Sequence, residues 1–180
     1  RQGLPFDSSG QLAASGDVLP ELLADWMNLP YHDEMAPKSL GVEWLQQSFW
    51  PVLAQHEHHG ALVTEDLLAT AVAYIAAQVR SAAKGRKTLV TGGGAFNEEL
   101  VRHFGEASPI GEGDVPFEAI VPDATLVQGK EAFAFGFLGL LRWLEWDNVW
   151  PEVTGSSMAH MGGALWGKNG LSSPSPNAMQ

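Results

Sequence analysis

The chain has 180 residues, 45% of them hydrophobic, which suits one compact domain or one lobe of a larger enzyme. Its 21 acidic and 10 basic residues give a net charge of −11, which repels phosphate backbones and argues against nucleic-acid binding. Cysteine is absent, which excludes disulfides, thiolate nucleophiles and cysteine-ligated zinc. No run approaches the ~20 apolar residues of a membrane span. We expect a cytoplasmic chain, and its start at Arg1 without methionine suggests a fragment of a longer protein.

The first half of the chain predicts mainly helices. A short extended segment over 6–16, with a turn at 7–10, precedes a helix over 18–28 that Asp17 can cap. A second helix begins near Val42 and is kinked or divided by Pro51. The clearest helix runs from Thr64, as its cap, to Lys84. Its apolar residues at helical spacing predict one buried stripe: Leu68, Ala71, Val72, Ile75 and Val79.

The second half mixes strands and helices. A strand over 88–91, without polar alternation, is expected to be buried on both faces and to lead into Gly92–Gly94 and a helix over 97–104. A second strand is predicted over 117–121. The helix over 130–145 is apolar nearly all round, so we expect it to be buried between layers. Residues 169–180 are rich in Ser, Pro and Asn and predict a disordered tail. The fold class is α/β and helix-rich.

The glycine run is the most informative candidate site. Three glycines between a buried strand and a helix bring backbone N–H groups to a ligand, and the helix start favours negative charge. The spacing fits neither the phosphate-loop pattern nor the dinucleotide-binding pattern, and a tight turn alone would also explain it. Asn97 either caps the following helix or holds a nucleotide.

Other candidates have both a structural and a functional reading. Glu131 either complements the positive start of the helix over 130–145 or accepts hydrogen bonds from a substrate. The run of histidines and glutamate over 56–59 lacks an i, i+4 histidine pair, so a solvated loop is favoured over a metal site. The tryptophans of the helix end are spaced for packing in a core or an interface: Trp143, Trp146 and Trp150.

Six segments, in order, resemble the C-terminal part of the anhydro-N-acetylmuramic acid kinase family. They are Phe6-Asp7-(x2)-Gly10-(x2)-Ala13-Ala14-Ser15-Gly16, Pro37-Lys38-Ser39-Leu40-Gly41-(x)-Glu43-Trp44, Asp66-Leu67-Leu68-Ala69-Thr70, Thr88 to Asn97, Lys130-Glu131-Ala132-Phe133-Ala134-Phe135, and Val153-Thr154-Gly155-Ser156. They occur in the family's order within residues 6–167.

The resemblance implies one lobe of an actin-like ATPase with ribonuclease-H-like topology, over residues 1–168 and without the N-terminal lobe. The family opens the 1,6-anhydro bond of anhydro-N-acetylmuramic acid with water and phosphorylates O6 with ATP and Mg, in peptidoglycan recycling. In the implied reaction, a base-activated water attacks the anomeric carbon while the liberated O6 takes the γ-phosphoryl group. Gly92, Gly93, Gly94 and Asn97 would bind the nucleotide, and Glu131 would contact the sugar.

Parts of the family pattern are missing from this sequence. The phosphate-binding glycine loop and the segment that carries the catalytic aspartate are absent, and Asp7 and Asp66 lack the context to replace that base. We therefore assign no catalytic residue and no metal ligand in this chain, which is expected to be inactive alone. The first three sheet strands of the family lobe are also missing. An edge left unpaired predicts pairing with an upstream segment, aggregation, or a homodimer.

Two other functions fit the same residues. The chain could be a non-catalytic nucleotide- or sugar-binding module of the same fold, which would bind adenine nucleotides without turnover. It could also be a structural or interaction domain, in which the glycines make only a turn and the tryptophans make an interface. A closed glycine turn and no response to ATP with Mg would favour this last alternative.

Overall fold

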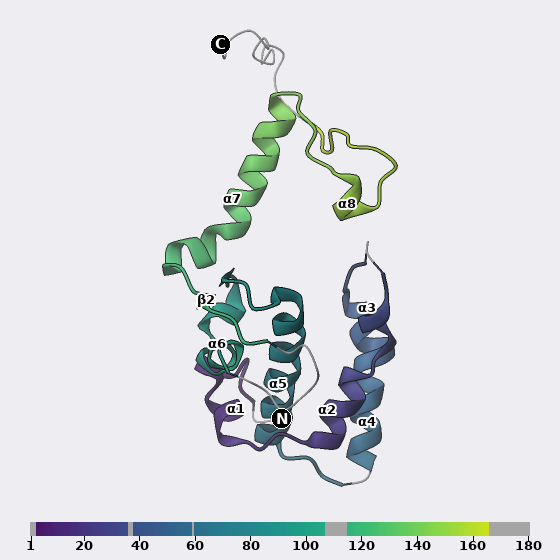
Figure 1. Ribbon diagram of the computed structural model, residues 1–180, viewed down its shortest axis with the longest axis vertical. Coiled ribbons are helices and arrows are strands. Elements are labelled where there is room, and N and C mark those ends of the chain that lie inside the picture. The colour runs from purple at the N-terminus through teal and green to yellow at the C-terminus, as the bar shows by residue number, and fades with distance from the viewer. Residues whose placement is uncertain (1–2, 36–37, 59, 107–114, 166–180) are drawn as a thin grey trace. The chain divides into compact units, whose positions relative to one another are not determined.

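The structure, a computed structural model, describes residues 3–35, 38–58, 60–106 and 115–165 (Figure 1). The chain divides into two compact units. The first comprises Arg1–Glu34 and Leu40–Gln128, and the second comprises Met35–Ser39 and Gly129–Gln180. The predicted tail over 169–180 lies outside the described residues.

The N-terminal segment is helical rather than extended, so the prediction for 6–16 was wrong beyond its turn. A 3-10 turn, η1 (Ser8–Gly10), leads directly into α1 (Gln11–Ser15). The Asp7 carboxylate accepts hydrogen bonds from the N–H groups of Leu12, at 2.9 Å, and Ala13, at 3.0 Å. These bonds satisfy N–H groups at the helix start and stabilise the turn that precedes it.

The next helix, α2 (Pro20–Met27), begins two residues later than expected, and Asp17 does not cap it. Instead, Thr70 Oγ1 accepts a hydrogen bond from the N–H of Leu19 at 2.9 Å. The backbone N–H of Asp17 itself donates to Asp66 Oδ1 at 2.9 Å. Side chains distant in sequence therefore fix the chain at this point. The helix buries an apolar face through Leu22, Leu23 and Trp26.

The second predicted helix is confirmed and is divided near Pro51. After a 3-10 turn, η2 (Pro30–Asp33), the chain forms α3 (Val42–Trp44), a π-helical turn, η3 (Leu45–Phe49), and α4 (Trp50–His58). Because proline lacks an N–H and clashes with the preceding turn, a π-bulge beside it is an expected adjustment. The histidines at 56 and 58 belong to α4, so the loop predicted there was wrong. The His56 imidazole pairs with the Asp25 carboxylate at 2.8 Å.

The long helix α5 (Thr64–Ala83) has two buried faces instead of one stripe. One face joins a cluster with α1 and α6 (Glu98–Phe104), and the other joins the cluster around Trp26, which stacks on Phe49. Ile75, predicted to be buried, is 42% exposed. Thr64 is the first helical residue and its side chain makes no cap, while Lys84 and Gly85 end the helix with φ values of 52° and 70°. Packing on two sides replaced the single amphipathic face that periodicity indicated.

A small parallel sheet follows, shorter than predicted. Strand β1 (Thr88–Leu89) pairs with β2 (Ala119–Ile120), with Thr88 opposite Ala119 and Leu89 opposite Ile120. Leu89 is 57% exposed, so burial of this strand on both faces was wrong. Phe117, just before β2, stacks on Phe104 of α6 (Glu98–Phe104) and joins the sheet to the first cluster. The described helices of this unit thus bury only part of the sheet.

The last long helix, α7 (Ala124–Trp143), begins six residues before the predicted start at 130. Asp123 Oδ1 accepts a hydrogen bond from the N–H of Leu126 at 3.0 Å, which caps this earlier start. The second unit adds α8 (Pro151–Thr154) and a bridge between Val149 and His160. None of the described helices is long and apolar enough to cross a membrane.

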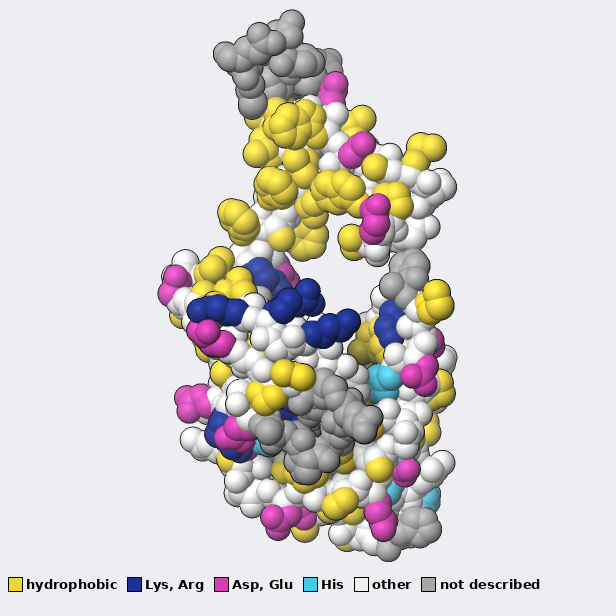
Figure 2. Space-filling model, viewed as in Figure 1, with side chains coloured by type: hydrophobic (Ala, Val, Ile, Leu, Met, Phe, Trp, Pro, Cys, Tyr) yellow, Lys and Arg dark blue, Asp and Glu magenta, His cyan; other side chains and the backbone are white. Residues whose placement is uncertain are grey.

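The expectation that α7 is buried between layers is wrong for this chain. Its Phe133 and Phe135 side chains are 74% and 71% exposed, and apolar side chains gather along the helix (Figure 2). The tryptophans at 143, 146 and 150 are exposed as well, so they do not form a core. The described residues of the second unit are too few to cover a helix that is apolar on all sides.

Candidate functional site

The glycine run follows β1 and forms a 3-10 turn, η4 (Gly93–Phe96), rather than entering a helix directly. Gly92, just before η4, has φ 78° and ψ −175°. This conformation is essentially restricted to glycine because a Cβ atom would clash with the backbone. The backbone thus explains the first glycine of the run without any ligand.

The other two glycines have no such structural explanation. Neither Gly93 nor Gly94 has a positive φ, and a Cβ atom added at Gly93 would meet nothing within 4 Å. At Gly94 it would make only an ordinary contact of 3.7 Å with Leu100. Side chains would be tolerated by the fold at both positions, and they would project into open space. The turn is therefore open, contrary to what a purely structural glycine turn would show.

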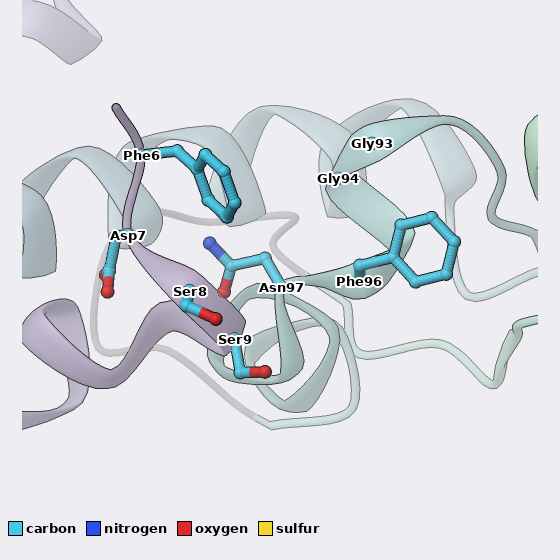
Figure 3. A pocket seen from close by; sticks show the side chains of 8 residues that line it. All are labelled: Phe6, Asp7, Ser8, Ser9, Gly93, Gly94, Phe96 and Asn97. Atoms are coloured by element: carbon cyan, nitrogen blue, oxygen red, sulfur yellow. The ribbon is translucent and has the colours of Figure 1, made fainter. Parts of the chain in front are cut away.

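That open space is a pocket of about 560 Å³ in the first unit (Figure 3). Two segments more than eighty residues apart in sequence line it: Phe6, Asp7, Ser8, Ser9, Gly93, Gly94, Phe96 and Asn97. Three of the four residues predicted to bind the nucleotide are thereby brought together, and Gly92 adjoins them without lining the wall. The wall formed by residues 6–9 was not predicted, since nothing local in that segment shows which distant loop it will meet.

Asn97 caps α6, as one of its two readings predicted. Its Oδ1 accepts a hydrogen bond from the N–H of Leu100 at 2.9 Å. The cap uses only the amide oxygen, and the amide nitrogen points toward Phe6 at the pocket (Figure 3). An asparagine amide carries two N–H donors, which here have no hydrogen-bond partner in the described part of the chain. The cap and a ligand contact are therefore compatible.

The two walls of the pocket are held against each other at Gly10. This residue is buried and has φ 76°, and a Cβ atom here would lie 2.2 Å from Asn97 Oδ1 and 2.6 Å from Glu99 Cβ. Only glycine allows the backbone to approach the cap so closely. The position of Asn97 thus depends on the segment that precedes α1.

The two aspartates considered as a replacement for the catalytic base, Asp7 and Asp66, have structural partners. Both oxygens of Asp7 accept backbone N–H groups at the start of α1, and Asp66 Oδ1 binds the N–H of Asp17. Within the described ranges, there is no group of three or more His, Asp or Glu residues that could hold a metal ion. We assign no ligand for Mg among the described residues, and we derive no step through it.

Glu131 does not lie at the start of a helix, contrary to the interpretation that it complements a helix N-terminus. It is an exposed residue well inside α7 and belongs to the second unit. Complementing a helix N-terminus therefore cannot explain it, because that effect fades after the first turn. It is not among the residues that line the pocket of the first unit.

Two of the family segments, at 37–39 and 153–156, belong to the second unit. Gly155, with φ 71°, ends α8 in the left-handed conformation that glycine favours. Thr154 Oγ1 donates a hydrogen bond to the carbonyl of Trp150 at 2.9 Å, within the same short helix. This hydrogen bond and the left-handed glycine give the segment 153–156 a local structural function. Pro37 lies outside the described residues.

Comparison with known proteins identifies the family. The family model described as anhydro-N-acetylmuramic acid kinase matches residues 1–168. A protein of that name from Colwellia psychrerythraea is 33% identical over 167 residues, which cover 84% of this chain and 41% of the relative. Relatives of the same name from Shewanella sp. strain W3-18-1 and Cupriavidus pinatubonensis are 32% and 31% identical, and each match covers 91% of this chain and 44% of the relative.

The chain is thus a helix-rich α/β protein with a small parallel sheet, an architecture compatible with these kinases. It belongs to the anhydro-N-acetylmuramic acid kinase family, as the resemblance predicted. It spans less than half the length of the curated relatives it matches.

Proposed function

We propose that this chain supplies the adenosine side of the nucleotide site in an anhydro-N-acetylmuramic acid kinase. The complete enzyme would use ATP and Mg to convert the anhydro-sugar to N-acetylmuramic acid 6-phosphate, and residues 1–168 would be part of its C-terminal, actin-like lobe. Use of ATP fits a cytoplasmic enzyme of peptidoglycan recycling. The observation that most directly supports this proposal is that Gly93 and Gly94 line a pocket, although neither backbone conformation nor packing requires glycine at these positions.

The chemistry of the pocket supports a nucleoside as its occupant. A volume of about 560 Å³ lies in the usual range for small-molecule sites. The N–H groups of Gly93 and Gly94 have no hydrogen-bond partner within the described ranges, so they are available to a ligand. Exposed apolar rings at Phe6 and Phe96 suit a flat base, and Asn97 adds donors. These N–H groups, rings and amide suit an uncharged adenosine at least as well as they suit phosphates, because binding of phosphates would require additional positively charged groups.

Glu131 is proposed to contact the sugar. This assignment rests on the family motif at 130–135 and on the loss of the helix-start explanation for an exposed carboxylate inside an apolar helix. A carboxylate accepts hydrogen bonds from sugar hydroxyl and amide groups. Because no base is assigned here, this chain alone is expected to bind without turnover.

The nucleotide site is tested by blocking the pocket at a glycine that the fold does not need. Gly93→Leu should abolish binding of AMP and ATP, measured by isothermal titration calorimetry, while the melting temperature stays within a few degrees of the parent. Gly60→Leu is the matched control, because a Cβ atom there also meets nothing within 4 Å and the residue is not in the pocket lining. Nucleotide binding that survives Gly93→Leu unchanged would remove the proposed site.

A non-catalytic binding module of the same fold is the second candidate, favoured by the structural bonds of Asp7 and Asp66. Both candidates predict nucleotide binding, and turnover separates them. In a chain with the full length of the relatives, the kinase predicts ATP-dependent formation of the sugar 6-phosphate. Glu131→Ala should then raise the KM for the anhydro-sugar, with Glu152→Ala as the control on α8. Unchanged kinetics for Glu131→Ala would remove the sugar-contact assignment.

A further inference from the structure

The second wall of the pocket, at residues 6–9, is not explained by the packing of the first unit. The Phe6 side chain is 72% exposed and yet lies at the pocket, across Asn97 from Phe96 (Figure 3). Burying an aromatic ring is favourable, and a ring left in water beside a cavity gains most when a ligand covers it. Packing within the described part of the first unit therefore does not account for the ring, whereas a ligand in the pocket would cover it.

The polar groups of this wall are also available. Within the described part of the chain, the hydroxyl groups of Ser8 and Ser9 have no hydrogen-bond partner, although both residues line the pocket. Ser9 has φ 54°, a left-handed conformation that costs a non-glycine residue about 1–2 kcal/mol. Asp7, by contrast, turns its carboxylate to the start of α1. The wall thus presents one apolar ring and two hydroxyl groups to the pocket. Its single charged group, the Asp7 carboxylate, is already hydrogen-bonded to backbone N–H groups of α1.

The wall has a fixed position relative to the glycine turn. Close approach of Gly10 to Asn97 Oδ1 holds the segment against the cap of α6, so that the amide nitrogen of Asn97 lies between the Phe6 ring and Ser8 (Figure 3). A flat ligand entering between the two walls would meet the ring on one side and the glycine backbone on the other. Hydrogen-bond donors would meet its edge.

We propose that the segment Phe6–Ser9 is the base- and ribose-binding wall of this pocket. The Phe6 ring stacks on the base, and the hydroxyl groups of Ser8 and Ser9 bind the ribose oxygens. The amide nitrogen of Asn97 donates to an acceptor nitrogen of the base. This inference rests on the proposed function, since it assumes that the occupant is a nucleotide. It adds Ser8 and Ser9 to the proposed site and gives each residue of the wall a particular contact with the ligand.

The test separates stacking on the base from every other effect by comparing AMP with ribose 5-phosphate, measured calorimetrically. Phe6→Leu keeps apolar volume but removes the aromatic face, and it should weaken AMP binding about tenfold, since base–aromatic stacking is typically worth that much or more. Binding of ribose 5-phosphate should stay unchanged. Phe6→Trp should retain AMP binding. Leu4→Ala is the control, since Leu4 is exposed and is not in the pocket lining.

The ribose contact has its own comparison. Ser8→Ala combined with Ser9→Ala should weaken AMP several-fold and leave 2′,3′-dideoxy-AMP unaffected, because that ligand lacks the hydroxyl groups in question. Equal loss of AMP and ribose 5-phosphate in Phe6→Leu would show a structural effect and overturn the stacking assignment. AMP binding unchanged in Phe6→Leu would also overturn it while leaving the proposed function intact. If the parent chain binds no AMP at all, the proposed function fails, and this inference fails with it.

Discussion

Replacing Gly10 by alanine should destabilise the first unit by about 2–3 kcal/mol. The left-handed backbone, with φ 76°, costs an alanine about 1–2 kcal/mol. The new Cβ atom would lie 2.2 Å from Asn97 Oδ1, so the cap of α6 must move, and loss of an asparagine cap costs about 1 kcal/mol. The two effects add because they act on different parts of the chain, one on the backbone of residue 10 and one on α6.

Urea denaturation followed by circular dichroism measures this change, with Gly60→Ala as a control that should alter stability by less than about 0.5 kcal/mol. The reasoning also predicts coupling between the two sites. In an Asn97→Ala background the cap is already lost, so Gly10→Ala should cost only the backbone strain and the contact with Glu99. Additive effects of the two substitutions would refute the proposed link between Gly10 and the cap.

Two further predictions concern the core of the first unit. Burial raises the pKa of Tyr74 to about 12. Because the folded state holds this proton more tightly than the unfolded state, the free energy of unfolding should be unaffected below pH 10 and should fall between pH 10 and 12, by on the order of 2 kcal/mol. Tyr74→Phe should flatten that dependence in urea titrations at several pH values, and a slope unchanged by the substitution would contradict it. Arg80 is 1% exposed and donates to the carbonyl of His103, joining α5 to α6. Arg80→Met should cost about 1–3 kcal/mol by leaving that carbonyl without its donor. Lys84→Met, at an exposed position, should change stability little, and equal effects of the two substitutions would contradict the role of Arg80.

Sequence patterns located most elements of the first unit, because local signals act over a few residues. The helix predicted over 18–28 was found as α2, and Asn97 caps α6 as one of its two interpretations predicted. Local signals failed where a distant residue competes for the same group. Aspartate is a residue type that often caps helices, but the backbone N–H of Asp17 donates a hydrogen bond to Asp66. The side chain of Thr70 accepts the hydrogen bond from the N–H of Leu19 in its place.

The sequence alone determined the family, the helix-rich α/β class and the glycine run as the place to look for a nucleotide, since each depends on residue identity and order. Tertiary structure decided which residues complete the pocket. The sequence does not distinguish a glycine at 93 that is needed for a turn from one that leaves room for a ligand. Only the tertiary structure shows that no protein atom fills the space beside Gly93. The approach of Phe6 to Asn97 depends on Gly10 fitting against the cap of α6, a contact between segments that no local pattern encodes.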